Sequence, residues 1–279
     1  MIMRIFVTGA TGYIGKAVVS ELIGAGHRVV GLTRSEQGGH VLESLGAEAV
    51  RGVIEDLDLL RGCAAASDGV IHLAFNHDFA HFDVSLATDL RAIEAMGEGL
   101  AGSGKPLVIT AHANGKASED AAFAHIEQGV KVSVVSLAPS VHGEGDKGFV
   151  PQFIRIARER GASAYVGDGA NRWPAIHRLD AAVLFRLAVE AAPAGARLDG
   201  VAEAGIPFRD IAGVIGRHAS VPVVGISREE AQAIYGFVGM VASLDLARSS
   251  EETKALLGWK PVQPGLLADL EQGHYFAKL

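Results

Sequence analysis

The sequence predicts an α/β fold with a doubly wound parallel sheet and a smaller C-terminal part. Short apolar runs alternate with segments of helical length over the first half of the chain. Strict alternation of strand and helix builds a parallel sheet that is covered by helices on both faces. A chain of 279 residues with 49% hydrophobic content is also long enough to bury a large core.

Six segments between residue 3 and about residue 138 have the character of parallel strands. They are nearly continuous apolar runs, as expected for strands covered on both faces. Between them, apolar residues recur at spacings of three and four, which indicates helices. The strands are "RIFVTG" from 4, "RVVGLTR" from 28, "AEAVRGV" from 47, "GVIHLAF" from 69, "PLVIT" from 106 and "KVSVVSLAP" from 131, and the helical faces are Ile14, Val18, Leu22 and Ala25, and Leu86, Leu90, Ile93, Gly97 and Leu100.

The composition excludes several classes of protein. The net charge is −7 and no cluster of lysine and arginine is present, so nucleic acid is not an expected partner. Cys63 is the single cysteine, which excludes an intrachain disulfide and a cysteine-built metal site. No signal peptide and no apolar run of about eighteen residues is present, so we expect a cytoplasmic protein without membrane contact.

The first turn, "VTGATGYIGK", is the first segment along the chain that indicates a binding site. Its glycines are spaced G-x-x-G-x-x-G, directly after a strand and at the start of a helix. Such glycines allow a sharp turn, a close approach of the backbone to a pyrophosphate, and tight packing of helix on strand. The turn therefore predicts a Rossmann-type dinucleotide site, with cofactor contacts from Gly9, Thr11, Gly12, Tyr13, Ile14 and Gly15.

The end of the second strand favours NADP over NAD. An acidic residue at this point would bind a ribose hydroxyl of NAD, but the sequence has Thr33, Arg34 and Ser35. Arg34 can pair with a 2′-phosphate and Ser35 can hydrogen-bond it. Alternatively, Arg34 is a solvated loop residue and Glu36 turns back to the ribose.

Beyond these residues, the chain resembles the extended branch of the short-chain dehydrogenase/reductase superfamily, which includes nucleotide-sugar epimerases, dehydratases and carbonyl reductases. The segments that carry the resemblance are "TGATGYIG", "EDLD" from 55, "HLAF" from 72, "LAPSVHGEG" from 137, "VGDGANRWPAIHRLDAA" from 166 and "LGWKP" from 257. The resemblance implies further cofactor contacts: Asp56 and Leu57 at the adenine, Leu73, Ala74 and Phe75 near the pyrophosphate, and Pro139 beside the nicotinamide.

The resemblance also implies a division of the chain. Residues 1–148 are expected to form the NADP-binding domain, with 175–200 returning to it, and residues 149–279 mainly the substrate-binding part. "GFVPQFIRIARERG" from 148 predicts an amphipathic helix at the substrate cleft. The helices around 84–102 and 117–129 match a pair that forms a dimer interface in relatives, so a homodimer is a candidate assembly.

The expected catalytic residues depart from the family. Its members use Tyr-x-x-x-Lys on a helix with a Ser or Thr after the fifth strand, but the tyrosines at 13, 165, 235 and 275 lie elsewhere. His112 and Lys116 have the same spacing, which on a helix places them on one face. The resemblance is closest to an atypical branch with a His-x-x-x-basic pair. We expect Thr110 to orient the substrate oxygen, His112 to handle the proton and Lys116 to hold the ribose.

Two features of this segment leave alternatives open. Lys116 and an oxidised nicotinamide would lower the pKa of His112, making it a better proton acceptor than donor. Asn114 and Gly115 are poor helix formers, so residues 112–115 can instead be a loop before a helix from about Ala117. The family's loop of roughly two dozen residues after the fifth strand is also missing. Either it is deleted, or residues are absent from the sequence, and we favour the second explanation.

The remaining candidates concern the substrate. "FNHDFAHFD" from 75 follows the fourth strand, and there we expect His77 to contact substrate rather than a metal. By resemblance, His142, Phe149, Trp173 and His177 border the substrate pocket, although such residues are equally consistent with a core. We expect no metal site, and no hydrolase or kinase motif is present.

The sequence therefore predicts an NADP-dependent oxidoreductase that acts on a small carbonyl or secondary alcohol. Two other functions remain open: an NADP-binding regulator or sensor without turnover, and a nucleotide-sugar epimerase or dehydratase. The absence of an obvious basic pair for a sugar nucleotide, apart from Arg172 and Arg178, lowers the last of these.

Overall fold

The structure is a computed structural model that describes residues 1–76, 78 and 81–277. The chain forms two compact units. Unit 1 comprises Met1–Ser136, Ala181–Leu198 and Glu252–Trp259, and unit 2 comprises Leu137–Asp180, Asp199–Glu251 and Lys260–Leu279.

A seven-stranded sheet forms the centre of unit 1. Its strand order is β10-β6-β5-β4-β1-β2-β3, and the pairs from β6 to β3 are parallel. The six strands predicted from the sequence are confirmed, and the doubly wound fold with them. The strands are β1 (Arg4–Thr8), β2 (Arg28–Thr33), β3 (Glu48–Arg51), β4 (Gly69–His72), β5 (Pro106–Thr110), β6 (Lys131–Leu137) and β10 (Ala196–Gly200).

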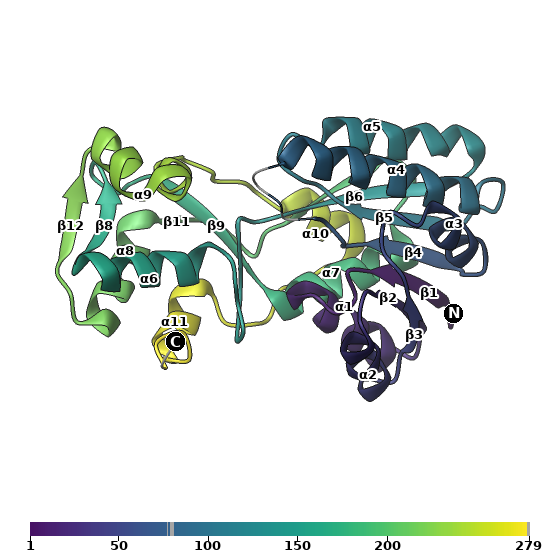
Figure 1. Cartoon of the computed structure of the whole chain (residues 1–279). Coiled ribbons are helices and arrows are strands. Elements are labelled where there is room, and N and C mark those ends of the chain that lie inside the picture. The colour runs from purple at the N-terminus through teal and green to yellow at the C-terminus, as the bar shows by residue number, and fades with distance from the viewer. Residues whose placement is uncertain (77, 79–80, 278–279) are drawn as a thin grey trace. The chain divides into compact units, whose positions relative to one another are not determined.

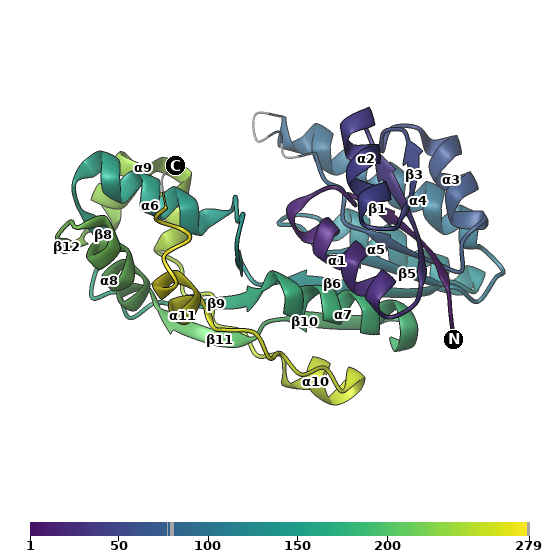
Figure 2. The ribbon, with the colours of Figure 1, turned by 90° about the horizontal axis from the view of Figure 1, so that it is seen from below.

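Helices cover both faces of this sheet, which explains why its strands are apolar along their whole length. α3, α4 and α5 lie on one face, and α1 and α7 lie side by side on the other (Figures 1 and 2). The side chains of Arg186 and Glu21 join α7 to α1 at 2.7 Å. The helices are α1 (Tyr13–Gly24), α2 (Glu36–Ser44), α3 (Leu57–Ala65), α4 (Phe82–Leu100), α5 (Lys116–Ala124), η1 (His125–Gln128), α7 (Arg178–Ala191) and α10 (Glu251–Leu257).

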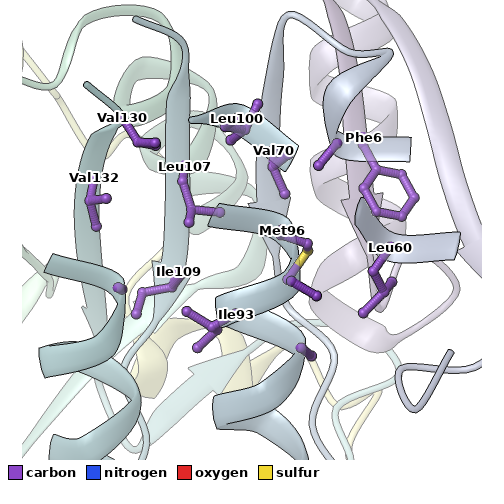
Figure 3. Packing of buried hydrophobic residues seen from close by; sticks show 14 of the residues in the cluster. Phe6, Leu60, Val70, Ile93, Met96, Leu100, Leu107, Ile109, Val130 and Val132 are labelled. Carbon is purple, nitrogen blue, oxygen red and sulfur yellow. The ribbon is translucent and has the colours of Figure 1, made fainter. Parts of the chain in front are cut away.

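The core of unit 1 lies between the sheet and α3 and α4 (Figure 3). Phe6 and Leu107 from the strands pack with Leu60 of α3 and with Ile93 and Met96 of α4, and all five are fully buried. Burial of one such side chain contributes roughly 1.5–3 kcal/mol, so the core fixes α4 firmly against the strands.

Unit 2 contains two small sheets. β7 (Ser140–His142), β9 (Arg172–His177) and β11 (Glu203–Pro207) form one sheet, and β8 (Ser163–Val166) pairs with β12 (Val223–Ile226) in the other. The helices are α6 (Phe149–Arg160), α8 (Phe208–Ala219), α9 (Arg228–Ala242) and α11 (Leu266–Glu271). The amphipathic helix predicted from residue 148 is therefore present as α6. In the part of the chain that the structure describes, no helix is long and apolar enough to cross a membrane.

The connection from β5 to α5 differs from the sequence expectation. β5 ends at Thr110 and α5 begins at Lys116, so only residues 111–115 join them and the long loop of the family is not formed. Asn114 has a left-handed backbone (φ 61°) and Gly115 N–H bonds the carbonyl of His112 in a turn. His112 and Lys116 therefore do not share a helical face. The alternative expectation, a loop before a helix from about Ala117, is correct to within one residue.

Candidate cofactor and proton-transfer site

The glycine-rich turn between β1 and α1 is built on close backbone contacts. Gly9 has φ +65°, and a Cβ there would lie 2.7 Å from the backbone nitrogen of Ala74. A Cβ on Gly15 would lie 2.0 Å from the carbonyl oxygen of Gly9. Gly12 is exposed and forms the N-cap of α1 without a side-chain cap. This arrangement leaves the N-terminus of α1 open to an anion.

The residues of this turn fit the pyrophosphate of a dinucleotide. Thr11, Tyr13 and Ile14 are partly exposed around Gly12, and Gly15 lies buried beneath them. Leu73 and Ala74 pass directly against Gly9 at the end of β4. The structure thus brings together the cofactor contacts expected from "TGATGYIG" and "HLAF" at the carboxyl edge of the sheet, where α/β folds bind ligands.

Two arginines lie near the ends of β2 and β3. Arg34 is exposed, and among the described residues no carboxylate pairs with it. Ser35 forms the N-cap of α2 by accepting a hydrogen bond from Gly38 N–H at 3.1 Å, which leaves its own proton available. Arg51, which was not predicted from the sequence, is the register partner of Thr33 on the adjacent strand. A surface hollow here is lined by Thr33, Ser35, Glu36, Gly39, His40, Glu43, Ala49 and Arg51.

Glu36 and Asp56 have local roles in the structure. Glu36 is largely exposed and its carboxylate lies 4.0 Å from His40 on the next turn of α2. Asp56 is the N-cap of α3 and accepts a hydrogen bond from Leu59 N–H at 3.1 Å. Leu57 is the first residue of α3. Contacts of Asp56 and Leu57 with an adenine ring remain a prediction.

His112 lies in the turn after β5, with one side toward the interior of unit 1. Its side chain is 17% exposed, and its Nε2 lies 3.8 Å from Oδ1 of Asp89. The ring of Phe75 is tilted against it, with the ring centroids 4.1 Å apart. Thr110 donates a hydrogen bond from Oγ1 to the carbonyl oxygen of His72 at 3.1 Å.

Lys116 occupies a different environment. Its side chain is 82% exposed, and its ammonium group bonds both carboxylate oxygens of Asp120, at 2.8 and 2.6 Å. The two residues are four apart on α5, so the pair lies along one helix face. The charge of Lys116 is therefore balanced locally by Asp120.

The structure also reveals a buried polar group in unit 1, which we call the Asp89 cluster: Thr8, His72, Asp89 and His112. His72 Nδ1 lies 2.6 Å from Thr8 Oγ1, and His72 Nε2 lies 3.1 Å from Asp89 Oδ1. The side chains of His72 and Asp89 are each only 1% exposed. Burial opposes ionisation of Asp89, but the hydrogen bond from His72 and the nearby Ser118 and His112 hold its pKa below the ordinary carboxyl value.

Asp89 and His72 were not among the site residues predicted from the sequence. His72 is hidden within the apolar strand "GVIHLAF", and Asp89 lies on the buried stripe of α4. The available signal is helical spacing, because Asp89 is three and four residues from Ala92 and Ile93, which are fully buried. A carboxylate on an apolar face requires a partner.

Of the substrate residues expected in unit 2, His142 and Trp173 are buried, and Phe149 and His177 are half-buried. Trp173 has no exposed surface and packs against Phe149, Phe153 and Phe208, with ring centroids 5.3–5.5 Å apart. Trp173 is therefore a core residue, which is the alternative that the sequence left open. Pro139 precedes β7, and His77 lies outside the described residues.

A second buried polar group, the Asp269 cluster, consists of His142, Asp269 and His274. His142 Nδ1 lies 2.9 Å from Asp269 Oδ2, and His274 Nε2 lies 3.7 Å from Asp269 Oδ1. Burial opposes ionisation of Asp269, but the hydrogen bond from His142 and the nearby histidines hold its pKa below the ordinary value. The ring of His177 meets His142 edge-on, with centroids 5.3 Å apart.

Tyr275 binds the C-terminal segment to the loop after β7. Its hydroxyl accepts a hydrogen bond from Gly143 N–H at 3.1 Å and donates one to Asp146 Oδ2 at 2.9 Å. Burial raises the pKa of Asp146. Among the residues that the structure describes, no group of three or more His, Cys, Asp or Glu side chains is arranged to hold a metal ion.

Comparison with known proteins identifies the family. Residues 5–97 match the NAD dependent epimerase/dehydratase family. A protein of Schizosaccharomyces pombe with no stated function is 44% identical, covering 98% of this chain and 100% of its own length. The 2-alkyl-3-oxoalkanoate reductase of Stenotrophomonas maltophilia is 29% identical, covering 72% of this chain and 69% of its own. The chain belongs to the NAD dependent epimerase/dehydratase family.

A solved structure shows the same fold. The dTDP-glucose 4,6-dehydratase DesIV of Streptomyces venezuelae, solved with NAD and TYD bound, has a TM-score of 0.76 at 16% identity. The match covers 98% of this chain and 97% of the other. It agrees with the Rossmann-type fold predicted from the sequence.

Proposed function

We propose that this protein is an NADP-dependent oxidoreductase that interconverts a small carbonyl compound and the corresponding secondary alcohol. The observation that carries the proposal is the position of His112. This partly exposed histidine, beside a buried carboxylate, follows β5 at the same edge of the sheet as the glycine-rich turn. The named activity of the Stenotrophomonas relative, a reductase of 3-oxoalkanoates, supports a carbonyl substrate.

When bound, NADPH would supply the hydride to the carbonyl carbon. His112 would deliver a proton to the carbonyl oxygen in reduction, and would accept it from the hydroxyl group in oxidation. Thr110 already donates its single proton to the His72 carbonyl, so it can accept a hydrogen bond in its present rotamer. To donate to a substrate oxygen, as expected from the sequence, the Thr110 hydroxyl must rotate.

Lys116 can hold a ribose hydroxyl only by changing partners. Its ion pair with Asp120 is exposed, and such pairs contribute about 0–1 kcal/mol. An exchange of Asp120 for a ribose hydroxyl is therefore energetically accessible, and the proposed role of Lys116 stands.

Arg34 and Arg51 support NADP rather than NAD. Arg34 has no carboxylate partner among the described residues, and Arg51 lines the hollow beside Thr33 and Ser35. Two guanidinium groups at the ends of neighbouring strands favour a 2′-phosphate. Glu36 and Glu43 line the same hollow, so NAD binding through Glu36 is the alternative that a cofactor titration must exclude.

Two other functions have specific support. The missing Tyr-x-x-x-Lys pair supports an NADP-binding sensor without turnover. The similarity in fold to DesIV supports a nucleotide-sugar dehydratase or epimerase. One observation weighs against a nucleotide-sugar substrate. Of Arg172 and Arg178, the two basic residues considered for its diphosphate, Arg172 already bonds Asp245 at 3.1 and 2.8 Å.

The activity is tested with a panel of aldehydes and ketones and with NADPH or NADH. We expect NADPH-dependent reduction, and a loss of kcat/KM of about 100-fold or more in His112→Ala. The matched control is His218→Ala, which removes a partly exposed histidine beside Glu271 in unit 2 and should retain activity within about threefold. Equal activity in His112→Ala and the wild type would remove His112 from the mechanism. NADPH binding without turnover would favour the sensor.

Cofactor preference is tested by calorimetric titration. Arg34→Ala and Arg51→Ala should each weaken NADP binding by about tenfold and leave NAD binding almost unchanged, since only NADP carries the 2′-phosphate. Arg28→Ala is the control, because Arg28 is exposed at the opposite end of β2. Equal losses for NAD and NADP would contradict the 2′-phosphate assignment.

A further inference from the structure

The Asp89 cluster connects the cofactor turn to His112 through buried side chains. Thr8 is the last residue of β1, His72 the last of β4, Asp89 lies on α4, and His112 follows β5. The four residues come from four separate elements of unit 1, and the core fixes the strands and α4 relative to one another. The positions of the protons in this cluster follow from its hydrogen bonds.

The hydroxyl of Thr8 determines the tautomer of His72. Thr8 Oγ1 accepts hydrogen bonds from the backbone N–H of Ala74 at 3.2 Å and of Leu73 at 3.3 Å, and the latter N–H is shared with the Thr8 carbonyl. The lone pairs of the hydroxyl are thus engaged, and its proton points to His72 Nδ1 at 2.6 Å. His72 Nδ1 is therefore an acceptor, and the ring proton is on Nε2, which donates to Asp89.

This tautomer leaves Asp89 with a negative charge that His72 does not neutralise. A neutral His72 satisfies one carboxylate oxygen, but it contributes no positive charge. Among the residues that the structure describes, the other titratable group beside Asp89 is His112, with Nε2 at 3.8 Å from Oδ1. Because the carboxylate is almost completely buried, its field at His112 is screened much less than that of a surface charge.

We propose that Asp89 is a positioning residue that stabilises the protonated imidazole of His112, so that His112 is held ready as a proton donor. The role as a donor in carbonyl reduction rests on the proposed function, whereas the coupling of Asp89 to His112 does not. Asp89 stays anionic throughout. In reduction, the proton on His112 goes to the substrate oxygen, and the neutral ring regains a proton from solvent at its exposed edge.

The other groups around His112 agree with this assignment. Lys116 on α5 would oppose protonation of His112, but its charge is balanced by Asp120 on the same helix. Phe75, after β4, presents its ring to the imidazole, and an aromatic face attracts a cation. β5 contributes the uncharged Thr110. The proposal reverses the sequence expectation that His112 is mainly a proton acceptor.

The first test needs no substitution. Long-range ¹H–¹⁵N NMR of the histidine side chains, recorded on the wild-type protein without cofactor from pH 5 to 9, reports the tautomer and charge of each ring. We expect His72 to remain a neutral Nε2–H tautomer at every pH, while His112 gains a proton as the pH falls. A His72 that carries its proton on Nδ1, or that titrates in this range, would overturn the proposal.

The second test removes the charge and keeps the shape. In Asp89→Asn, the amide oxygen can still accept from His72 Nε2, and the pH midpoint of the His112 titration should fall by about one unit or more. Glu94→Gln is the matched control, because Glu94 is an exposed carboxylate on the same helix and its loss should shift the midpoint by less than about 0.3 units. Equal shifts in the two variants would refute a specific role for Asp89.

The kinetic test separates this proposal from the proposed function. With an accepted carbonyl substrate, the alkaline limb of the kcat/KM profile should move to lower pH in Asp89→Asn by the same amount as the His112 titration. If the NMR shift is seen but no substrate is reduced, the Asp89–His112 coupling stands and the proposed function fails. If turnover occurs but neither its pH profile nor the His112 titration responds to Asp89→Asn, the coupling proposal fails alone.

Discussion

The two units each contain a buried carboxylate between two histidines, with almost the same local geometry. Asp89 lies 3.1 Å from the buried His72 and 3.8 Å from the partly exposed His112. Asp269 lies 2.9 Å from the buried His142 and 3.7 Å from the partly exposed His274. The side-chain chemistry alone therefore does not distinguish the two clusters.

Their surroundings do distinguish them. The Asp89 cluster lies at the carboxyl edge of a parallel sheet, and Thr8 connects it to the backbone beside the glycine-rich turn. The Asp269 cluster joins β7 to α11, and the neighbouring Tyr275 fastens the C-terminal segment to the loop after β7. We infer that the first cluster serves proton transfer and the second holds unit 2 together.

The largest expected effect concerns the turn that sets the Asp89 cluster apart. In Gly15→Ala, the new methyl group would overlap the carbonyl of Gly9, and NADPH affinity should fall by about 100-fold or more. Gly24→Ala is the control at the other end of α1, because a Cβ there meets no atom within 4 Å. Equilibrium titration of NADPH measures both. Normal binding by Gly15→Ala would show that the turn is not the cofactor site.

The next effect tests the structural role of the Asp269 cluster. Asp269→Ala leaves the buried Nδ1 of His142 without its acceptor, and the free energy of unfolding should fall by about 2–3 kcal/mol. Glu271→Ala, two residues further on and with an exposed carboxylate, should leave the free energy of unfolding almost unchanged. Urea denaturation followed by circular dichroism gives both values. Equal costs for the two variants would mean that the His142–Asp269 pair does not hold unit 2 together.

In one respect the two clusters should behave alike, namely in their response to acid. The pKa of Asp89 in the native state lies below its ordinary value, so its ionic contribution to stability is present above about pH 4 and is lost as the pH falls further. The same holds for Asp269. Because Asp89 is also proposed to stabilise the protonated His112, the stability gap between wild type and Asp89→Asn should grow as the pH falls from 8 to 5, and then shrink by about 1 kcal/mol toward pH 3 as Asp89 takes up a proton. A gap that continues to widen below about pH 4 would contradict this sign.

The smallest effects are expected at exposed ion pairs. Arg155 and Glu159 on α6 form an i,i+4 pair at 2.8 Å, as do Lys116 and Asp120 on α5 at 2.6 Å. Arg155→Ala and Lys116→Ala should each change the free energy of unfolding by less than about 0.5 kcal/mol. Only Lys116→Ala should also weaken NADPH binding, by several-fold. If neither variant alters binding, Lys116 is a surface residue without a cofactor role.

The sequence predicted the parts of the molecule that depend on local pattern. The six strands and the glycine-rich turn follow from apolar runs and from positions where only glycine fits, as at Gly9 and Gly15. The pairing of Asp89 with His72 was not predicted, because each residue lies within an apolar pattern and its partner comes from a distant part of the chain. The four-residue spacing of His112 and Lys116 wrongly predicted a shared helical face, because Asn114 turns the chain before α5 begins.

That turn has a consequence for protein engineering. Because α5 begins at Lys116, a tyrosine introduced as His112→Tyr would place its phenol on a loop and not one helical turn below the lysine. The substitution would not recreate the usual Tyr-x-x-x-Lys pair of short-chain dehydrogenases. A redesign would first have to extend α5 by a full turn toward its N-terminus, replacing Asn114 and Gly115 with helix-forming residues. Only then could a single substitution at position 112 replace the imidazole with a phenol in the same position relative to Lys116.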